Sequence, residues 1–249
     1  MLARGPERGE LARPACGGYP SGEVWLACKV VEILGGRYST ELGMDVDAGD
    51  AEVERWFLAA TLFGAWISAR IAERTFSMLT GAGLVRHVPS AHLIGLLNAG
   101  GYARYDFRAA NRLLALAELI GERYDGQAAV IDRRFGAYPG LSAALAALPG
   151  WGPVTVRLFL RELRGVWPGA EPPLDERAAA AAAHLGLLGA GAAGPQLPAL
   201  GRLAKAAGLD LRDLESALVR LSLAHRRVMP SCPAGQACTA LHQPGTKAR

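Results

Sequence analysis

The sequence predicts an all-α protein, and three observations support this prediction. Apolar residues recur at the three- and four-residue spacing of a helix face through most of the 249-residue chain. Residues that favour helix starts precede several of these segments, and glycines follow some of them. No segment combines alternating polarity with a hairpin turn, and no repeat of fixed period is present.

The composition is that of a globular protein. Apolar residues make up 51% and charged residues 20%, which excludes a disordered chain and allows a sizeable core. The net charge of +4 permits a nucleic-acid partner without requiring one. Two uncharged stretches, 135–156 and 178–201, are interrupted by proline or rich in Ala and Gly, so neither predicts a membrane span. No secretory signal or disulfide framework is visible, so we expect a cytoplasmic protein.

The predicted helices follow a loose leader at residues 1–22. Gly64 interrupts a long apolar pattern, so two helices are expected around it. Asp106, Asp175 and Asp210 are expected N-caps, as is Ser90. The predicted segments are 24–34 (helix or strand), two helices within 51–79, then 90–97, 107–124, 141–148, 153–163, 176–188, 197–207 and 211–226.

The most informative segment is the turn Leu-Pro-Gly-Trp-Gly-Pro-Val-Thr at residues 148–155. Gly150 and Gly152 permit the positive φ angles of a tight helix–helix turn, and Pro153 suits the first turn of the next helix. With so little side-chain bulk, the amides at that helix start can point at an anion, which is typical of a phosphate site. An ordinary helical hairpin that contains two glycines is the alternative. The basic residues that follow on the same helix are Arg157, Arg161 and Arg164.

This octet resembles the helix-hairpin-helix of the endonuclease III-like DNA glycosylase superfamily. The hairpin of that superfamily reads Leu-Pro-Gly-hydrophobe-Gly, with a Thr near the start of the next helix. Trp151 departs from the pattern, because a smaller aliphatic residue is usual there. The matching residues are Leu148, Pro149, Gly150, Gly152 and Thr155.

The superfamily also has an aspartate shortly after the second helix of the hairpin. Asp175, which ends a Pro-Pro-Leu-Asp segment, is its counterpart here, so the resemblance implies that Asp175 is the catalytic carboxylate. The gap from the hairpin is a few residues longer than in endonuclease III and nearer to the alkylpurine glycosylases. A plain N-cap is the other interpretation, and the two roles are compatible because a capping aspartate is held rigid and ionised.

Weaker similarity extends backwards, so that the resemblance covers about residues 50–190. Trp66 falls at a DNA-facing position of the family, while Tyr102 and Arg104 fall in a loop before a long helix. A wedge into the duplex and a phosphate contact are expected from that loop, with a solvated loop as the alternative. For Trp66 the alternative is core packing. The residues expected to contact DNA are Gly150, Trp151, Gly152, Val154, Thr155, Arg157, Trp66, Tyr102 and Arg104.

The resemblance implies a base excision repair glycosylase that hydrolyses the N-glycosidic bond of a damaged base flipped from duplex DNA. Bifunctional relatives carry a lysine just before the Thr of the hairpin. Val154 occupies that position, so we expect monofunctional chemistry without efficient strand cleavage. An alkylated purine is the first expected substrate and an oxidised pyrimidine the second. The alternatives are a helix-hairpin-helix module that binds DNA without catalysis, and an unrelated helical protein without DNA affinity.

Many relatives end in a Cys-x6-Cys-x2-Cys-x5-Cys motif that holds an iron–sulfur cluster. Cys232 and Cys238 have the last spacing of that motif, but Ser222 and Met229 stand at the other two positions. Two thiolates do not hold a [4Fe–4S] cluster, so we expect no cluster and no other metal or cofactor. The five histidines show no ligand spacing in the sequence and are expected to be surface or core residues.

The resemblance further implies two helical subdomains that flank a cleft. One is a helical barrel at residues 50–165 that ends in the helix-hairpin-helix motif. The other joins residues 1–49 to residues 166–249, with a loose C-terminal tail. Asp175 is expected at the mouth of the cleft. The expected partner is double-stranded DNA with a damaged base, bound by a monomer that is nucleoid-associated and not membrane-bound.

Overall fold

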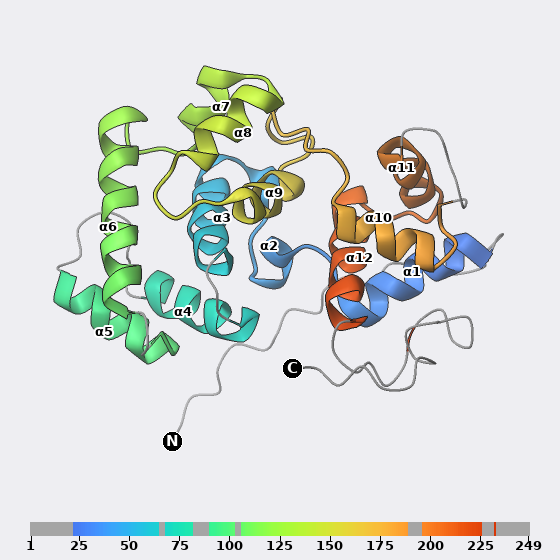
Figure 1. Cartoon of the computed structure of the whole chain (residues 1–249), viewed down its shortest axis with the longest axis horizontal. Helices are drawn as coiled ribbons and strands as arrows, with labels where there is room; N and C mark the ends of the chain where they lie inside the picture. The colour runs from blue at the N-terminus through green and yellow to red at the C-terminus, as the bar shows by residue number, and fades with distance from the viewer. Residues whose placement is uncertain are drawn as a thin grey trace. The chain divides into compact units, whose positions relative to one another are not determined.

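The computed structural model describes residues 22–64, 68–81, 90–102, 106–188, 196–225 and 232. The regular structure of these residues is entirely helical, as predicted (Figure 1). Two compact units divide the chain: a larger one, Tyr38–Pro173, and a smaller one that joins Met1–Arg37 to Leu174–Arg249. None of the helices in the described ranges has the length and hydropathy needed to cross a membrane.

Among the described residues, the larger unit contains eight α-helices and one 3-10 helix. They are α2 (Tyr38–Glu41), η1 (Val46–Ala48), α3 (Asp50–Phe63), α4 (Ala69–Gly81), α5 (Ser90–Gly100), α6 (Asp106–Arg123), α7 (Ala129–Phe135), α8 (Tyr138–Ala146) and α9 (Pro153–Glu162). The smaller unit contains α1 (Gly22–Leu34), α10 (Glu176–His184), α11 (Gln196–Ala206) and α12 (Leu211–His225).

The long apolar segment 51–79 divides into two helices, as predicted. Gly64 is the C-cap of α3, and its φ of −70° is an ordinary helical value. A glycine is needed there for another reason, because a Cβ on Gly64 would collide with the side chain of Thr155. The missing side chain therefore lets the start of α9 pack closely against the end of α3.

An aromatic cluster connects α3, the turn before α9, and α9 itself. The rings of Phe57 and Trp151 stack with their centroids 4.5 Å apart. Phe159 meets the rings of Phe57, Trp151 and Trp167 edge-on, at 5.6, 5.1 and 5.2 Å. The indole N–H of Trp151 donates to the Thr61 hydroxyl oxygen at 3.1 Å, so the polar edge of the ring is also satisfied inside the core.

The sequence pattern missed two short helices, α2 and α7, whose N-terminal amides are bonded by buried or partly buried acids from other helices. Glu162 of α9 accepts hydrogen bonds from the backbone N–H groups of Tyr38 and Ser39, both at 2.9 Å. Glu54 of α3 accepts in the same way from Ala128 at the start of α7. Because these acceptors lie far away in the chain, no local capping pattern announces either helix.

The larger unit extends beyond the predicted limits of residues 50 and 165 at both ends. At the N-terminal end, Glu162 bonds the start of α2 to α9. At the C-terminal end, the carboxylate of Asp132 on α7 accepts a hydrogen bond from the backbone N–H of Gly169 at 3.1 Å. These two long-range contacts tie the flanking segments to the same core.

The smaller unit is built on close packing between α10 and α12. The buried face of α10 is made of Ala178, Ala181 and Ala182, whose small side chains allow the two helix backbones to approach. Arg220 of α12 donates to the carbonyl oxygen of Leu34 at 2.9 Å, which satisfies the C-terminal end of α1. The segment 24–34, for which a helix and a strand were both considered, is therefore a helix of this core.

The substitution Glu162→Gln tests the buried acid through its pH dependence. Burial raises the pKa of Glu162, against the lowering effects of Arg161 and of the hydrogen bonds from Ser39 and Tyr38. The folded chain therefore binds this proton more tightly than the unfolded chain, so the contribution of Glu162 to stability falls as pH rises above about 4.5. Gln does not titrate, so the variant should gain unfolding free energy relative to wild type as pH rises, measured by urea unfolding at a series of pH values.

Glu118→Gln, at an exposed position on α6, is the matched control because it removes the same charge from the surface. Its unfolding is measured at the same pH values, so that the pH dependence specific to the buried carboxyl is obtained by difference. A difference between Glu162→Gln and wild type that stays constant with pH would show that Glu162 does not titrate as described.

Candidate functional site

The turn between α8 and α9 is a tight helical hairpin. The backbone N–H of Trp151 donates to the carbonyl oxygen of Leu148 at 3.0 Å. Gly150 has a φ of +82°, as predicted, in the left-handed region that favours glycine. The same prediction for Gly152 is wrong: its φ of −98° and ψ of 176° are extended, because this residue is the N-cap of α9.

The N-terminus of α9 is open to solvent. Pro153 occupies the first turn and Val154 is 53% exposed, while Gly152 has no side chain. No side chain of the described residues caps this helix end. A Cβ built on Gly152 would meet no atom of the described residues within 4 Å, so a side chain has room at this position. Amides at an uncovered helix N-terminus are suited to bind an anion such as phosphate.

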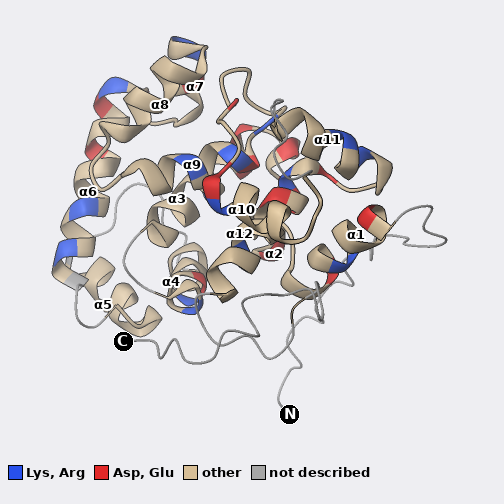
Figure 2. Ribbon diagram, turned by 45° about the vertical axis from the view of Figure 1, so that its right-hand side comes forward, with Lys and Arg blue, Asp and Glu red and all other residues tan. Residues whose placement is uncertain are grey.

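Arg112 on α6 lies against this turn and was missed in the sequence. A Cβ on Gly150 would collide with the aliphatic part of the Arg112 side chain and lie 2.8 Å from its Nε. The positive φ of Gly150 and the absence of its Cβ thus let this exposed arginine lie across the hairpin. Figure 2 colours further basic residues along the ribbons of α6 and α9. Arg108 lies one helical turn before Arg112. No motif on α6 signals this contact, because the two residues are far apart in the chain.

Three residues that were predicted to contact DNA have buried side chains, and their contact with DNA stays a prediction. Trp151 is 4% exposed and its ring belongs to the aromatic cluster. Thr155 is 2% exposed and packs against the end of α3. Tyr102 is 4% exposed, its hydroxyl donates to the carbonyl oxygen of Leu62 at 3.3 Å, and burial raises its pKa to about 12. These side chains support the hairpin and the end of α3 from inside the core.

The basic residues that follow the hairpin, two within α9 and Arg164 just beyond its end, are also less accessible than expected. Arg161 and Arg164 are 4% and 8% exposed, so they do not add their charge to an open anion site at the helix start. Arg157, one turn into the helix, is partly buried. Its predicted DNA contact and that of the Val154 amide stay predictions. Two further predicted contacts, Trp66 and Arg104, lie outside the described residues.

Asp175 is the N-cap of α10 in the smaller unit. Its backbone is extended and its Oδ1 accepts a hydrogen bond from the backbone N–H of Arg177 at 2.8 Å. Its own N–H donates to the carboxylate of Glu215 at 3.2 Å, and the residue is only 7% exposed. The capping interpretation is thus confirmed, and the catalytic role stays a prediction.

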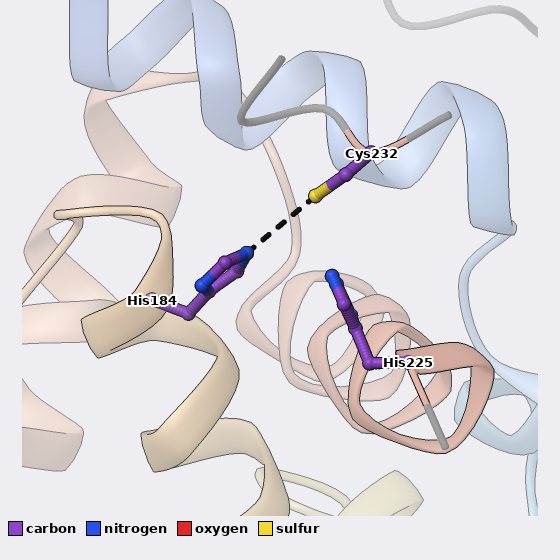
Figure 3. A group of neighbouring side chains, drawn as sticks. All are labelled: His184, His225 and Cys232. Atoms are coloured by element: carbon purple, nitrogen blue, oxygen red, sulfur yellow. Dashed lines mark hydrogen bonds between the residues drawn. The ribbon is translucent and has the colours of Figure 1, made fainter. Parts of the chain in front are cut away.

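A second group of reactive side chains lies at the ends of α10 and α12 (Figure 3). The ligand atoms of His184, His225 and Cys232 lie within 4.8 Å of one another. The Sγ of Cys232 is 3.6 Å from Nε2 of His184, and the two imidazole centroids are 4.8 Å apart. Burial, with a further contribution from His225, lowers the pKa of His184, so that this ring is neutral at neutral pH. The spacing of the three residues in the sequence did not indicate this group.

These residues do not fit the iron–sulfur cluster that many relatives in the resembled superfamily hold. A [4Fe–4S] cluster is held by four cysteine thiolates, whereas this group contains one thiol and two imidazoles. Ser222, at the first of the motif positions, has no thiol to contribute. The donor set therefore differs in kind from that of an endonuclease III-like cluster.

No family model matches the chain, and neither a curated protein nor a solved structure is significantly similar to it.

The two roles of Asp175 are separated by a pair of substitutions. Asp175→Ala removes the acceptor for the Arg177 N–H and should lower the unfolding free energy by about 1 kcal/mol, the usual cost of losing an N-cap. Asp175→Asn keeps a good capping side chain and should remain within a few tenths of a kcal/mol of wild type. Urea unfolding followed by circular dichroism measures both. An Asn variant as unstable as the Ala variant would show that the negative charge itself, not the cap, stabilises this site.

Proposed function

We propose that the protein is a base excision DNA glycosylase that releases a damaged base from duplex DNA without cutting the strand. The observation that carries this proposal is the hairpin before α9. Gly150 lies in the left-handed region, and Gly152 is an N-cap residue without a capping side chain. Val154 is exposed, so the backbone amides at this helix start are open to an anion. This site is built from the same octet that resembles the helix-hairpin-helix of the glycosylase superfamily.

In the proposed complex, the amides at the start of α9 bind a backbone phosphate of the DNA. The positive end of the helix dipole favours the negative charge, and Arg112 adds a cation beside Gly150. Such contacts position the protein on the duplex and do not select a base. Trp151 and Thr155 contribute indirectly, because their buried side chains hold the turn on the core.

The chemistry is base hydrolysis at a nucleotide turned out of the helix. Departure of the base leaves positive charge on the sugar, and a fixed carboxylate stabilises that charge and directs water to the anomeric carbon. Asp175 is the residue proposed for this role, since its cap fixes the carboxylate. Val154 supplies no amine at the position of the family's lysine, so no Schiff base and no efficient strand cleavage are expected there. An alkylated purine remains the first substrate class.

A non-catalytic DNA-binding module is the second candidate, and one observation favours it. Asp175 is nearly buried, its Oδ1 bonds its own helix end, and its N–H bonds Glu215. A purely structural aspartate has these features. The hairpin supports both candidates equally, so the two functions differ only in whether a base is released.

Gly152→Asp tests the anion site without damage to the fold. Asp is a better N-cap than Gly, and its Cβ enters open space, so stability should be equal or higher by a few tenths of a kcal/mol. The new carboxylate would occupy the position of the phosphate and repel the DNA backbone. We expect the dissociation constant for a duplex oligonucleotide to rise at least about tenfold, measured by fluorescence anisotropy at fixed salt.

Gly152→Ser is the matched variant, because it caps the helix without a charge and should weaken binding less. Arg112→Ala should also weaken binding, whereas Arg123→Ala, at an exposed position near the other end of α6, should not. Unchanged affinity in both Gly152→Asp and Arg112→Ala would exclude this face as the DNA interface.

A panel of duplexes with alkylated, oxidised and deaminated bases tests catalysis. Wild type should generate abasic sites at one lesion class, with strand breaks only after hot alkali. Asp175→Asn, which keeps the cap, should bind the same duplex within about twofold and lose base release by a factor of about 100 or more.

The controls in this assay separate the two candidate functions. Duplex binding without base release by wild type would replace the glycosylase proposal with the binding module. Strand breaks without alkali, together with a borohydride-trapped complex, would show that an amine acts despite Val154.

A further inference from the structure

We propose that His184, His225 and Cys232 bind a zinc ion, which joins the ends of α10 and α12 to the segment that follows α12. The proposal does not depend on the function proposed above, because the hairpin and Asp175 contribute no ligand. It rests on the convergence of three metal-binding side chains from three separate parts of the chain (Figure 3).

The spacing of the donor atoms matches a tetrahedral zinc site. Zinc binds histidine nitrogen at about 2.0–2.1 Å and cysteine sulfur at about 2.3 Å. In a tetrahedron these bond lengths put a sulfur and a nitrogen about 3.6 Å apart, and two nitrogens about 3.3 Å apart. Nε2 of His184 and Sγ of Cys232 are already separated by 3.6 Å. All three donors lie within 4.8 Å of one another, so a side-chain adjustment on the order of 1 Å completes the set.

His225 is oriented as a metal ligand by a backbone group. Its Nδ1 lies 2.9 Å from the carbonyl oxygen of Leu221. A carbonyl oxygen only accepts hydrogen bonds, so in the neutral ring Nδ1 carries the proton and Nε2 has the lone pair that a metal requires. A backbone carbonyl that holds the far side of the ring is the usual outer partner of a metal-bound histidine. Figure 3 shows the outer ring nitrogen of His225 pointing toward His184 and Cys232.

The position of the group also favours a cation. His184 is the last residue of α10 and His225 is the last residue of α12. The carbonyl ends of helices carry partial negative charge, so two of them near one point stabilise a bound cation. Cys232 is 7% exposed and not in a disulfide, and its sulfur faces the His184 ring. Two imidazoles and one thiolate form a donor set that suits zinc, with the fourth position for water or a further donor.

The experiment is a cobalt(II) titration of the full chain after removal of metal with a chelator. Cobalt occupies tetrahedral zinc sites, and a bound thiolate gives an ultraviolet charge-transfer band. We expect saturation at one equivalent and loss of the cobalt signal when zinc is added. Cys232→Ser should lose the band, and His184→Gln and His225→Gln should weaken binding by more than about 100-fold, beyond the usual effect of an outer partner.

Two variants control for the other thiols and imidazoles. Cys28→Ala removes a buried thiol that contacts the carbonyl oxygen of Ala207, and His92→Gln removes an exposed histidine on α5. Both should titrate like wild type. Circular dichroism checks that each variant is helical, and thermal unfolding of wild type with and without zinc gives a test that needs no variant.

The proposal is overturned if wild type shows no saturable cobalt band and no rise in thermal midpoint with zinc. It is also overturned if Cys232→Ser keeps the band at wild-type intensity, because the thiolate would then come from another cysteine.

Discussion

The larger unit depends on the burial of one tryptophan at the tip of a helical hairpin. Trp151 stacks on Phe57, meets Phe159 edge-on, and donates its indole proton to Thr61. Burial of a ring of this size is a large favourable term, and each aromatic pair adds about 0.5–1.5 kcal/mol. The turn cannot leave the core without exposing this ring, so the backbone amides before α9 are held in a fixed position. A hairpin that has to bind an anion through its backbone needs that rigidity.

The same arrangement explains why the helix start can stay bare. A better N-cap residue at position 152 would raise the unfolding free energy by only a few tenths of a kcal/mol. Gly150 accepts a positive φ and leaves room for Arg112. The weaker cap at Gly152 costs little local stability, and the aromatic core holds the turn in place. The proposed phosphate contact requires such an arrangement, with an open helix start on a rigid support.

Polar groups from distant residues set the limits of the two units. Glu162 and Asp132 bond the segments that flank the larger core, and Glu54 bonds the start of α7. In the smaller unit, Glu215 bonds the backbone of Asp175, while the ends of α10 and α12 bring two imidazoles and a thiol together. The aspartate and the proposed metal site thus lie at opposite ends of α10. The smaller unit therefore carries two chemical groups on one short, alanine-rich helix.

Local sequence determined the helical class, the break at Gly64 and the cap at Asp175, because periodicity, glycine and capping act over a few residues. It also identified the hairpin and the left-handed conformation of Gly150. Tertiary structure decided which side chains of that hairpin are accessible. Trp151, an expected DNA contact, became a core residue because α3 and α9 offer it aromatic partners. Tertiary structure also placed Arg112 against the hairpin and brought the two histidines together with Cys232. Packing between distant helices creates these contacts, so they leave no periodic or spacing signal in the chain.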